Sequence, residues 1–168
     1  MAIIETVIMI LLGAVFGGLL VYFSLKDKIQ LMKTHKKQRR TAILEEVAEH
    51  LGKVSHVFGK YASLINEIGP KTDRMSIKQE NELETLSNQL VEVYEQVSLA
   101  EAKLLMLGEK RLHKTLKLYT GKMAQFRKQF YPGRYQNVDQ TTAFKKELST
   151  IRDQFYDTLS ERYDQAMA

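Results

Sequence analysis

The feature that most constrains this chain is a stretch of 20 residues without a charge, from Thr6 to Leu25. At 1.5 Å per residue, a helix of that length spans roughly 30 Å, the thickness of the hydrocarbon core of a bilayer. Tyr22 and Phe23 stand near its end, where amphipathic rings favour the membrane interface. The stretch therefore predicts a single transmembrane helix within residues 1–25.

Two alternative interpretations of this stretch are less favoured by the residues around it. A cleaved signal peptide has a basic n-region and a shorter apolar region, whereas the residues before Thr6 carry Glu5 and no Lys or Arg. The acidic fifth residue before an apolar helix resembles the start of a mature type IV pilin. The basic block that follows and the absence of strand-like segments are unlike that family, so an uncleaved anchor is the favoured interpretation.

A basic segment at residues 26–40 follows the apolar stretch directly. Its seven basic residues against Asp27 give a charge of +6, and they are Lys26, Lys28, Lys33, Lys36, Lys37, Arg39 and Arg40. The positive-inside bias places the N-terminus outside and everything from Lys26 onward in the cytoplasm. We expect these side chains to contact anionic lipid headgroups, each contributing about 1 kcal/mol.

Small residues recur within the apolar stretch at a spacing typical of helix dimers. Gly13 and Gly17 form a GxxxG pattern, and Ala14 with Gly18 repeats the spacing. Small residues four apart form a flat strip where two helix backbones approach closely. We therefore expect these four residues to form a packing strip and the protein to be a homodimer.

Residues 41–168 show helical periodicity throughout, and no stretch alternates with period two. Apolar stripes with three- and four-residue steps run over 47–68, 83–107, 112–130 and 144–163. The breaks between them are Gly69-Pro70, a phase slip at Gly108, and Tyr131-Pro132-Gly133. Ser76 with Gln79 predicts a capping box, and Asp139 predicts the cap of the last helix. The predicted fold class is all-α: a transmembrane helix followed by an antiparallel bundle of three or four long helices.

Charge is strongly segregated along this bundle. Residues 41–102 carry five bases and eleven acids, whereas residues 103–134 carry nine bases and one acid. If the first two bundle helices pair antiparallel about the turn at 69–75, residue 41 lies beside 103 and residue 25 beside about 119. That register predicts that Lys122, Arg127 and Lys128 reach the anionic membrane surface, with a bend at Gly108, at Gly121 or within 26–40.

No pattern in the chain indicates catalysis or metal binding. There is no Cys, the four histidines are His35, His50, His56 and His113, and the phosphate-binding, dinucleotide, hydrolase and metalloprotease motifs are absent. The acids of residues 80–101 read as a solvated helix face. We expect no enzyme activity, no cofactor and no metal.

The leading functional hypothesis is a non-enzymatic, membrane-anchored helical scaffold or adaptor that binds an unidentified protein partner or itself. In architecture it is similar to membrane-tethered spectrin-like proteins. Two hairpins from two chains would complete a four-helix bundle, which also favours a homodimer. The alternatives are an accessory or signalling subunit of a larger membrane complex, and a membrane tether for nucleic acid. The last is disfavoured because Tyr119, Phe126 and Phe130, which interleave with basic residues, lie on the apolar stripe.

Overall fold

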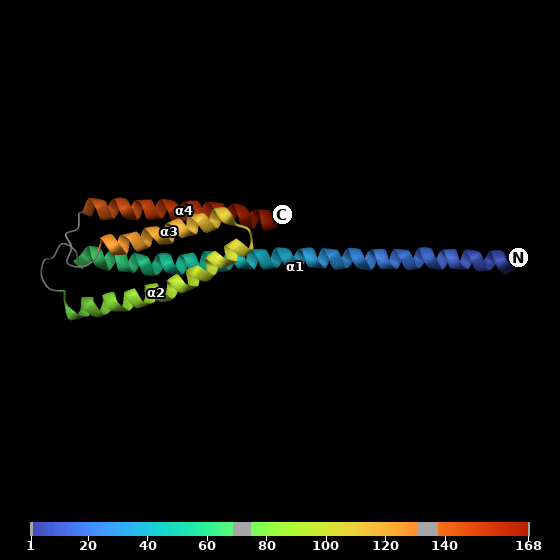
Figure 1. Cartoon of the computed structure of the whole chain (residues 1–168), viewed down its shortest axis with the longest axis horizontal. Helices are drawn as coiled ribbons and strands as arrows, with labels where there is room; N and C mark the ends of the chain where they lie inside the picture. Colours follow the sequence, from blue (N-terminus) through green and yellow to red (C-terminus); the bar gives the residue numbers. More distant parts are fainter. Residues whose placement is uncertain (1, 69–74, 131–137, 168) are drawn as a thin grey trace. The chain divides into compact units, whose positions relative to one another are not determined.

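The computed structural model describes residues 2–68, 75–130 and 138–167, and for residues 2–16, 19, 20 and 138 the backbone only. These residues form four helices and no strands: α1 (Ala2–Ile68), α2 (Ile77–Met106), α3 (Lys110–Gln129) and α4 (Val138–Met167) (Figure 1). The chain divides into two compact units, Met1–Arg40 and Thr41–Ala168. The predicted all-helical class and the helical bundle are thus confirmed.

The second unit is a four-helix bundle with up-down-up-down topology. Its contacts with α1 are those of Glu46 with Lys103 of α2, Ser55 with Tyr119 and Phe58 with Phe126 of α3, and Glu45 with Tyr163 and Ala48 with Tyr156 of α4. Residue numbers rise together along α1 and α3 but run oppositely along α1 and α4. One chain therefore supplies all four helices, and the expectation that two hairpins from two chains are needed to complete the bundle is wrong.

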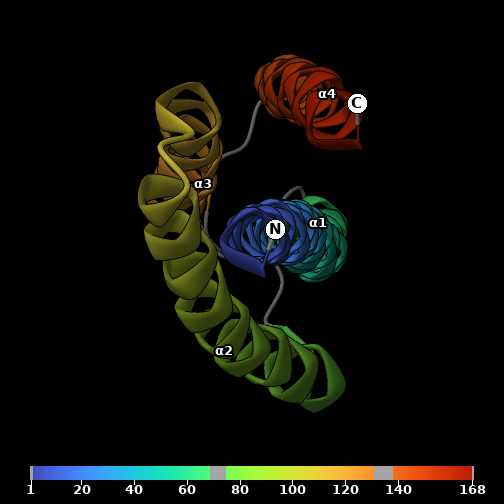
Figure 2. The same ribbon diagram turned by 90° about the vertical axis from the view of Figure 1, so that its right-hand side faces the viewer.

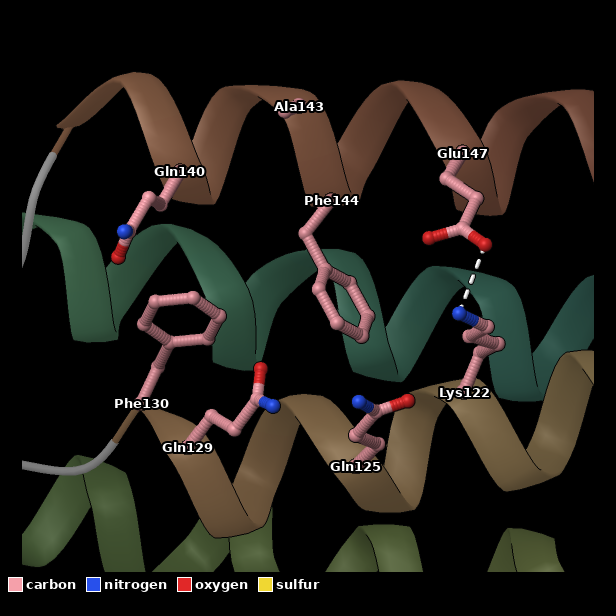
Figure 3. A pocket seen from close by; sticks show the side chains of 8 residues that line it. All are labelled: Lys122, Gln125, Gln129, Phe130, Gln140, Ala143, Phe144 and Glu147. Carbon is pink, nitrogen blue, oxygen red and sulfur yellow. Dashed lines mark ion pairs between the residues drawn. The ribbon is translucent and has the colours of Figure 1, made fainter.

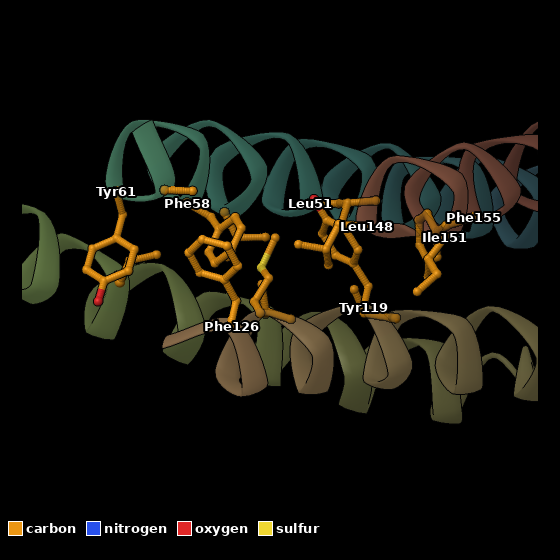
Figure 4. Packing of buried hydrophobic residues seen from close by; sticks show 14 of the residues in the cluster. Leu51, Phe58, Tyr61, Tyr119, Phe126, Leu148, Ile151 and Phe155 are labelled. Carbon is orange, nitrogen blue, oxygen red and sulfur yellow. The ribbon is translucent and has the colours of Figure 1, made fainter. Parts of the chain in front are cut away.

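The core consists of the predicted apolar stripes. The stripe of α1 from Val47 to Ile68 and that of α3 from Leu112 to Phe130 are buried at every predicted position. Phe126 is fully buried, and its ring centroid lies 5.3 Å from that of Phe58 on α1 (Figure 4). Its centroid also lies 5.6 Å from that of Phe144 on α4. Edge-to-face packing of this kind joins three helices through one side chain.

A local signal in the sequence sets the start of α2. The backbone N–H of Gln79 donates to Oγ of Ser76 at 3.3 Å, and the Ser76 N–H donates to Oε1 of Gln79 at 3.1 Å. The predicted capping box is therefore confirmed. The last helix, α4, begins at Val138, so Asp139 lies inside its first turn and the prediction that it caps the helix is wrong. The two breakers Gly69-Pro70 and Tyr131-Pro132-Gly133 lie outside the described residues.

The chain reverses direction at Gly108, which has a φ of +74°. The N–H of Gly108 donates to the carbonyl of Leu105, and the N–H of Glu109 donates to that of Leu104, which is the hydrogen-bond pattern of a Schellman motif. The predicted break at Gly108 is confirmed, whereas Gly121 lies within α3.

The register that we predicted for the segment after Gly108 is wrong. Tyr119 lies beside Ser55, and the guanidinium of Arg127 lies 5.6 Å from the centre of the Tyr61 ring. Because α3 turns back along α1, Arg127 is level with Tyr61. Tyr61 lies 20 residues, or about 30 Å at 1.5 Å per residue, along the helix from Thr41. The geometric reason for placing Lys122, Arg127 and Lys128 at the membrane surface is therefore lost.

The described residues of the first unit, 2–40, belong to the continuous helix α1. In the part of the chain that the structure describes, no helix is long and apolar enough to cross a bilayer. The predicted transmembrane stretch falls mostly on residues 6–16, 19 and 20, whose side chains lie outside the described residues. The transmembrane helix stays a prediction.

Candidate functional site

An open groove of about 610 Å³ lies between α3 and α4 in the described part of the bundle and is a candidate binding site. Figure 3 shows two rows of side chains facing each other across it. α3 supplies Lys122, Gln125 and Gln129, and Phe130 follows directly after its end. α4 supplies Gln140, Ala143, Phe144 and Glu147. The helical spacing of each set places its members on the same side of their helix.

An ion pair limits one end of the groove. Nζ of Lys122 lies 2.7 Å from Oε1 of Glu147 and 5.6 Å from the centre of the Phe144 ring. The rings of Phe130 and Phe144 meet edge to face, with centroids 5.9 Å apart and an interplanar angle of 81°. The charged groups are thus already paired, and the rings form the apolar floor beside them.

The remaining polar groups of the groove are the carboxamides of Gln125, Gln129 and Gln140. Each carboxamide both donates and accepts hydrogen bonds. Together with two phenyl rings, they suit a neutral ligand that carries amide or hydroxyl groups, such as an extended peptide. None of the lining residues is a Ser, Cys or His, so the groove holds no side chain of the usual nucleophile–base pairs.

A smaller pocket of about 270 Å³ lies where α1, α3 and α4 meet. Oη of Tyr119 and Oγ of Ser55 are 2.9 Å apart at its base, and burial raises the pKa of the Tyr119 hydroxyl. Burial also lowers the pKa of Lys145, whose ammonium has no ion pair among the described residues. This pocket combines hydroxyl groups with one partly desolvated cation.

The basic residues of the predicted juxtamembrane segment are exposed, except that Arg40 is half-buried. In the predicted packing strip, Gly17 and Gly18 are exposed, and an added Cβ at either would meet no atom within 4 Å. Gly13 and Ala14 lie outside the residues whose side chains are described.

The basic residues predicted in the second unit have partners within the bundle or lie exposed on its surface. Lys122 pairs with Glu147, Arg127 lies over the ring of Tyr61, and Lys128 is exposed. The interleaved rings of Tyr119, Phe126 and Phe130 are buried in the core, as the stripe predicted. Buried rings cannot stack on bases, so these three rings do not supply the stacking surface that a nucleic-acid tether would use.

The histidines do not gather into a site. Among the residues that the structure covers, no group of three His, Asp or Glu side chains could hold a metal ion. Nε2 of His50 lies 3.5 Å from Oε1 of Glu46 without a hydrogen bond between them. Glu46 accepts a hydrogen bond from Lys103, and this bond is the main reason that the pKa of the Glu46 carboxyl is lowered. The cluster ties α1 to α2 at a partly exposed position.

Sequence reasoning missed the groove between α3 and α4. Gln125, Gln129 and Gln140 read as ordinary polar residues outside the apolar stripes, and the sequence does not show which of them face each other. The opposite charges of Lys122 and Glu147 were the one signal in the sequence, but they can be paired only when the register of α3 against α4 is known.

Comparison of the chain with protein-family models, with curated proteins and with solved structures found no match.

Proposed function

We propose that this protein is a non-enzymatic scaffold or adaptor whose helical bundle is anchored to a membrane by one N-terminal helix. The single observation that carries the proposal is the uncharged stretch Thr6–Leu25, which is followed directly by the basic segment 26–40. An apolar stretch of this length matches the bilayer core, and the asymmetry of Lys and Arg orients it with the bundle in the cytoplasm.

Exposed apolar side chains in the first unit support the anchor. Val21, Tyr22, Phe23 and Leu25 are each more than half exposed. Contiguous exposed apolar surface of this kind is unusual in water and is typical of contact with lipid or protein. The same helix continues with exposed Lys26, Lys28, Lys33, Lys36, Lys37 and Arg39, which suits an anionic headgroup layer.

The character of the bundle supports a binding role. The groove between α3 and α4 is lined by carboxamides, phenyl rings and an internal ion pair rather than by an unpaired acid or base. Such a surface holds a partner through hydrogen bonds and apolar contact. The partner that we propose is another protein segment or a second copy of this chain.

The anchor is tested by alkaline carbonate extraction of membranes that contain the full-length chain. Replacing Leu12 and Leu19 by Arg adds two charges to the apolar stretch, each of which costs at least about 2.5 kcal/mol at the centre of a bilayer. We expect this variant to be extracted and the original chain to remain in the membrane. A matched variant, with Leu31 and Met32 replaced by Arg, lies outside the stretch and should remain. Extraction of the original chain would refute the proposal.

The orientation is tested by thiol labelling, which is simple because the chain has no Cys. A membrane-impermeant maleimide should label Ala2→Cys in intact cells and Met167→Cys only after the cells are permeabilised. Met167 is 63 % exposed, so its variant is accessible in the folded bundle. Labelling of Met167→Cys in intact cells would refute a cytoplasmic bundle.

A second candidate function, a signalling or accessory subunit, is favoured by the continuity of α1 from Ala2 to Ile68. A continuous helix that enters a bundle can transmit a rotation or a piston shift. Insertion of one Ala after Gln38 rotates everything that follows by about 100°. A signalling subunit would lose the response of its partner complex, whereas a scaffold would still co-purify with its partner in mild detergent.

A further inference from the structure

Two neighbouring helices of the bundle carry opposite, unpaired charges. The exposed acids of α2 are Glu80, Glu82, Glu84, Glu92 and Glu95, and the exposed bases of α3 are Lys110, Arg111, Lys114, Lys117 and Lys128. None of the ion pairs in the described part of the chain uses any of them. Figures 1 and 2 show the C-terminal half of α2 lying beside α3.

Exposed apolar side chains stand among these charges. Leu99 on α2 is 61 % exposed, and Leu118 on α3 is 51 % exposed. Leu105 and Met106, at the corner before Gly108, are 52 % and 79 % exposed. Apolar residues ringed by charges are typical of a surface that binds protein rather than one that only faces water.

We propose that this α2–α3 face is the docking surface for a second copy of the chain, with α2 of each copy lying on α3 of the other. The inference deepens the proposed function and rests on it only for the anchoring of both copies in one membrane. Charge complementarity selects the partner. The acidic helix α2 needs a basic helix opposite it, and the basic helix α3 needs an acidic one. A second copy of the chain supplies both when its α3 lies on α2 and its α2 lies on α3.

Symmetry then fixes how the two copies are oriented. Two faces can meet about a two-fold axis that lies in the interface, either along the helices or across them. An axis across the helices places α2 against α2 and brings like charges together. An axis along the helices places α2 against α3, and it leaves both copies pointing in the same direction. Because like charges repel each other, the charges favour the axis along the helices.

The reversal at Gly108 gives the register of the contact. Residues equally far from Gly108 on α2 and α3 lie at nearly the same height, and a two-fold axis along the helices preserves height. Leu99 lies nine residues before Gly108 and Leu118 ten residues after it. The proposed dimer therefore places Leu99 of one copy against Leu118 of the other, with Glu95 within reach of Lys117.

The size of this face indicates a weak association. Two helices about 10 Å wide that meet over about 20 residues, or about 30 Å, cover roughly 600 Å² on each copy. A standard stable interface covers about 800 Å² on each partner. Confinement to one membrane raises the effective concentration of the second copy and compensates for the smaller area.

Disulfide trapping tests the register. The full-length chain in mild detergent is prepared as two differently tagged single-Cys variants, Leu99→Cys and Leu118→Cys, and the two are mixed and oxidised. We expect the mixed Leu99–Leu118 disulfide to exceed either homotypic disulfide by about tenfold, since like-charged helices repel each other in the alternative arrangement. Predominant Leu99–Leu99 cross-linking, or no cross-linking, would overturn the proposal.

Charge exchange tests the complementarity. Glu92→Lys with Glu95→Lys, or Lys114→Glu with Lys117→Glu, should each weaken dimerisation about tenfold at low salt. All four changes in one chain restore opposite charges across the interface and should restore the dimer. The matched control, Lys60→Glu with Lys146→Glu, alters two exposed lysines elsewhere and should leave the dimer unchanged.

Other occupants of the surface give different results. If α3 instead binds anionic lipid or nucleic acid, the Lys114→Glu, Lys117→Glu chain loses that binding, and reversal of the α2 acids does not restore it. Failure of dimer recovery in the fourfold variant would therefore overturn the second-copy proposal. Carbonate extraction is read separately, so loss of the anchor and loss of the dimer are distinguished.

Discussion

Gly108 determines whether the chain after α2 turns back or continues, and its replacement gives the sharpest test of the fold. Gly108 has a φ of +74°, in the left-handed region where an L side chain places its Cβ too close to the following carbonyl. An Ala there costs about 1–2 kcal/mol in backbone strain. A Cβ at this position would meet no other atom within 4 Å, so no steric clash adds to that figure.

Gly121 provides the matched comparison, because it lies in the interior of α3 and is exposed. A Cβ at Gly121 would also meet no atom within 4 Å. Ala in a helix interior is about 1 kcal/mol more favourable than Gly. We therefore expect Gly108→Ala to lower the free energy of unfolding by about 1 kcal/mol and Gly121→Ala to raise it by about 1 kcal/mol.

Urea unfolding of the full-length chain in mild detergent, followed by far-ultraviolet circular dichroism, measures both changes. A difference of about 2 kcal/mol between the two variants corresponds to roughly 6–10 °C in Tm for a bundle of this size. Gly108→Asn is a further control, since Asn tolerates the left-handed conformation better than Ala and should cost less. If Gly108→Ala stabilised the protein as much as Gly121→Ala, the reversal of the chain at Gly108 would be wrong.

Three further predictions concern the core, a buried tyrosine and an ion pair. Phe126→Ala should lower the free energy of unfolding by about 3–5 kcal/mol and Phe126→Leu by about 1 kcal/mol in the same assay, because the ring is fully buried; equal losses would contradict the burial of the ring. Burial raises the pKa of Tyr94 to about 12. The neutral hydroxyl therefore contributes its full stabilisation below the ordinary pKa range of tyrosine, and this stabilisation is lost as the pH rises toward 12. Tyr94→Phe should reduce the loss of stability at alkaline pH, and identical profiles of stability against pH for the two proteins would refute this prediction. Nε of Arg162 lies 3.2 Å from Oε2 of buried Glu109 without a hydrogen bond; Arg162→Met should therefore cost about 1–2 kcal/mol, whereas Lys53→Met, which breaks an exposed pair, should cost less than about 0.5 kcal/mol.

The sequence predicted those parts of the fold that depend on local signals. The four apolar stripes, the capping box at Ser76 and the break at Gly108 each follow from a few neighbouring residues. Helical periodicity identifies the buried side of a helix because the same side chains must face the core whichever helix covers them. For this reason Leu112, Tyr119 and Phe126 were placed in the core although the helix that covers them was placed incorrectly.

The sequence did not predict the direction of the chain after Gly108. Residues 104–107 are apolar on every side, so a slip in phase fits both a bent helix and a complete reversal. The choice depends on the φ of Gly108 and on whether α3 finds a partner surface on α1 and α4. The groove between α3 and α4 was missed for the same reason, because its two rows face each other only in the register set by that reversal.

The outward lysines of α3 are explained better by a partner than by the bundle itself. α3 has no exposed acid among the basic residues from Lys110 to Lys128, and its core side is already complete without them. Like charges spaced along one helix repel each other and slightly destabilise it. α2 carries the opposite sign under the same disadvantage, so each helix gains when the other's copy lies on it. In the proposed dimer, the two-fold axis that achieves this runs along the helices and leaves both bundles pointing in the same direction.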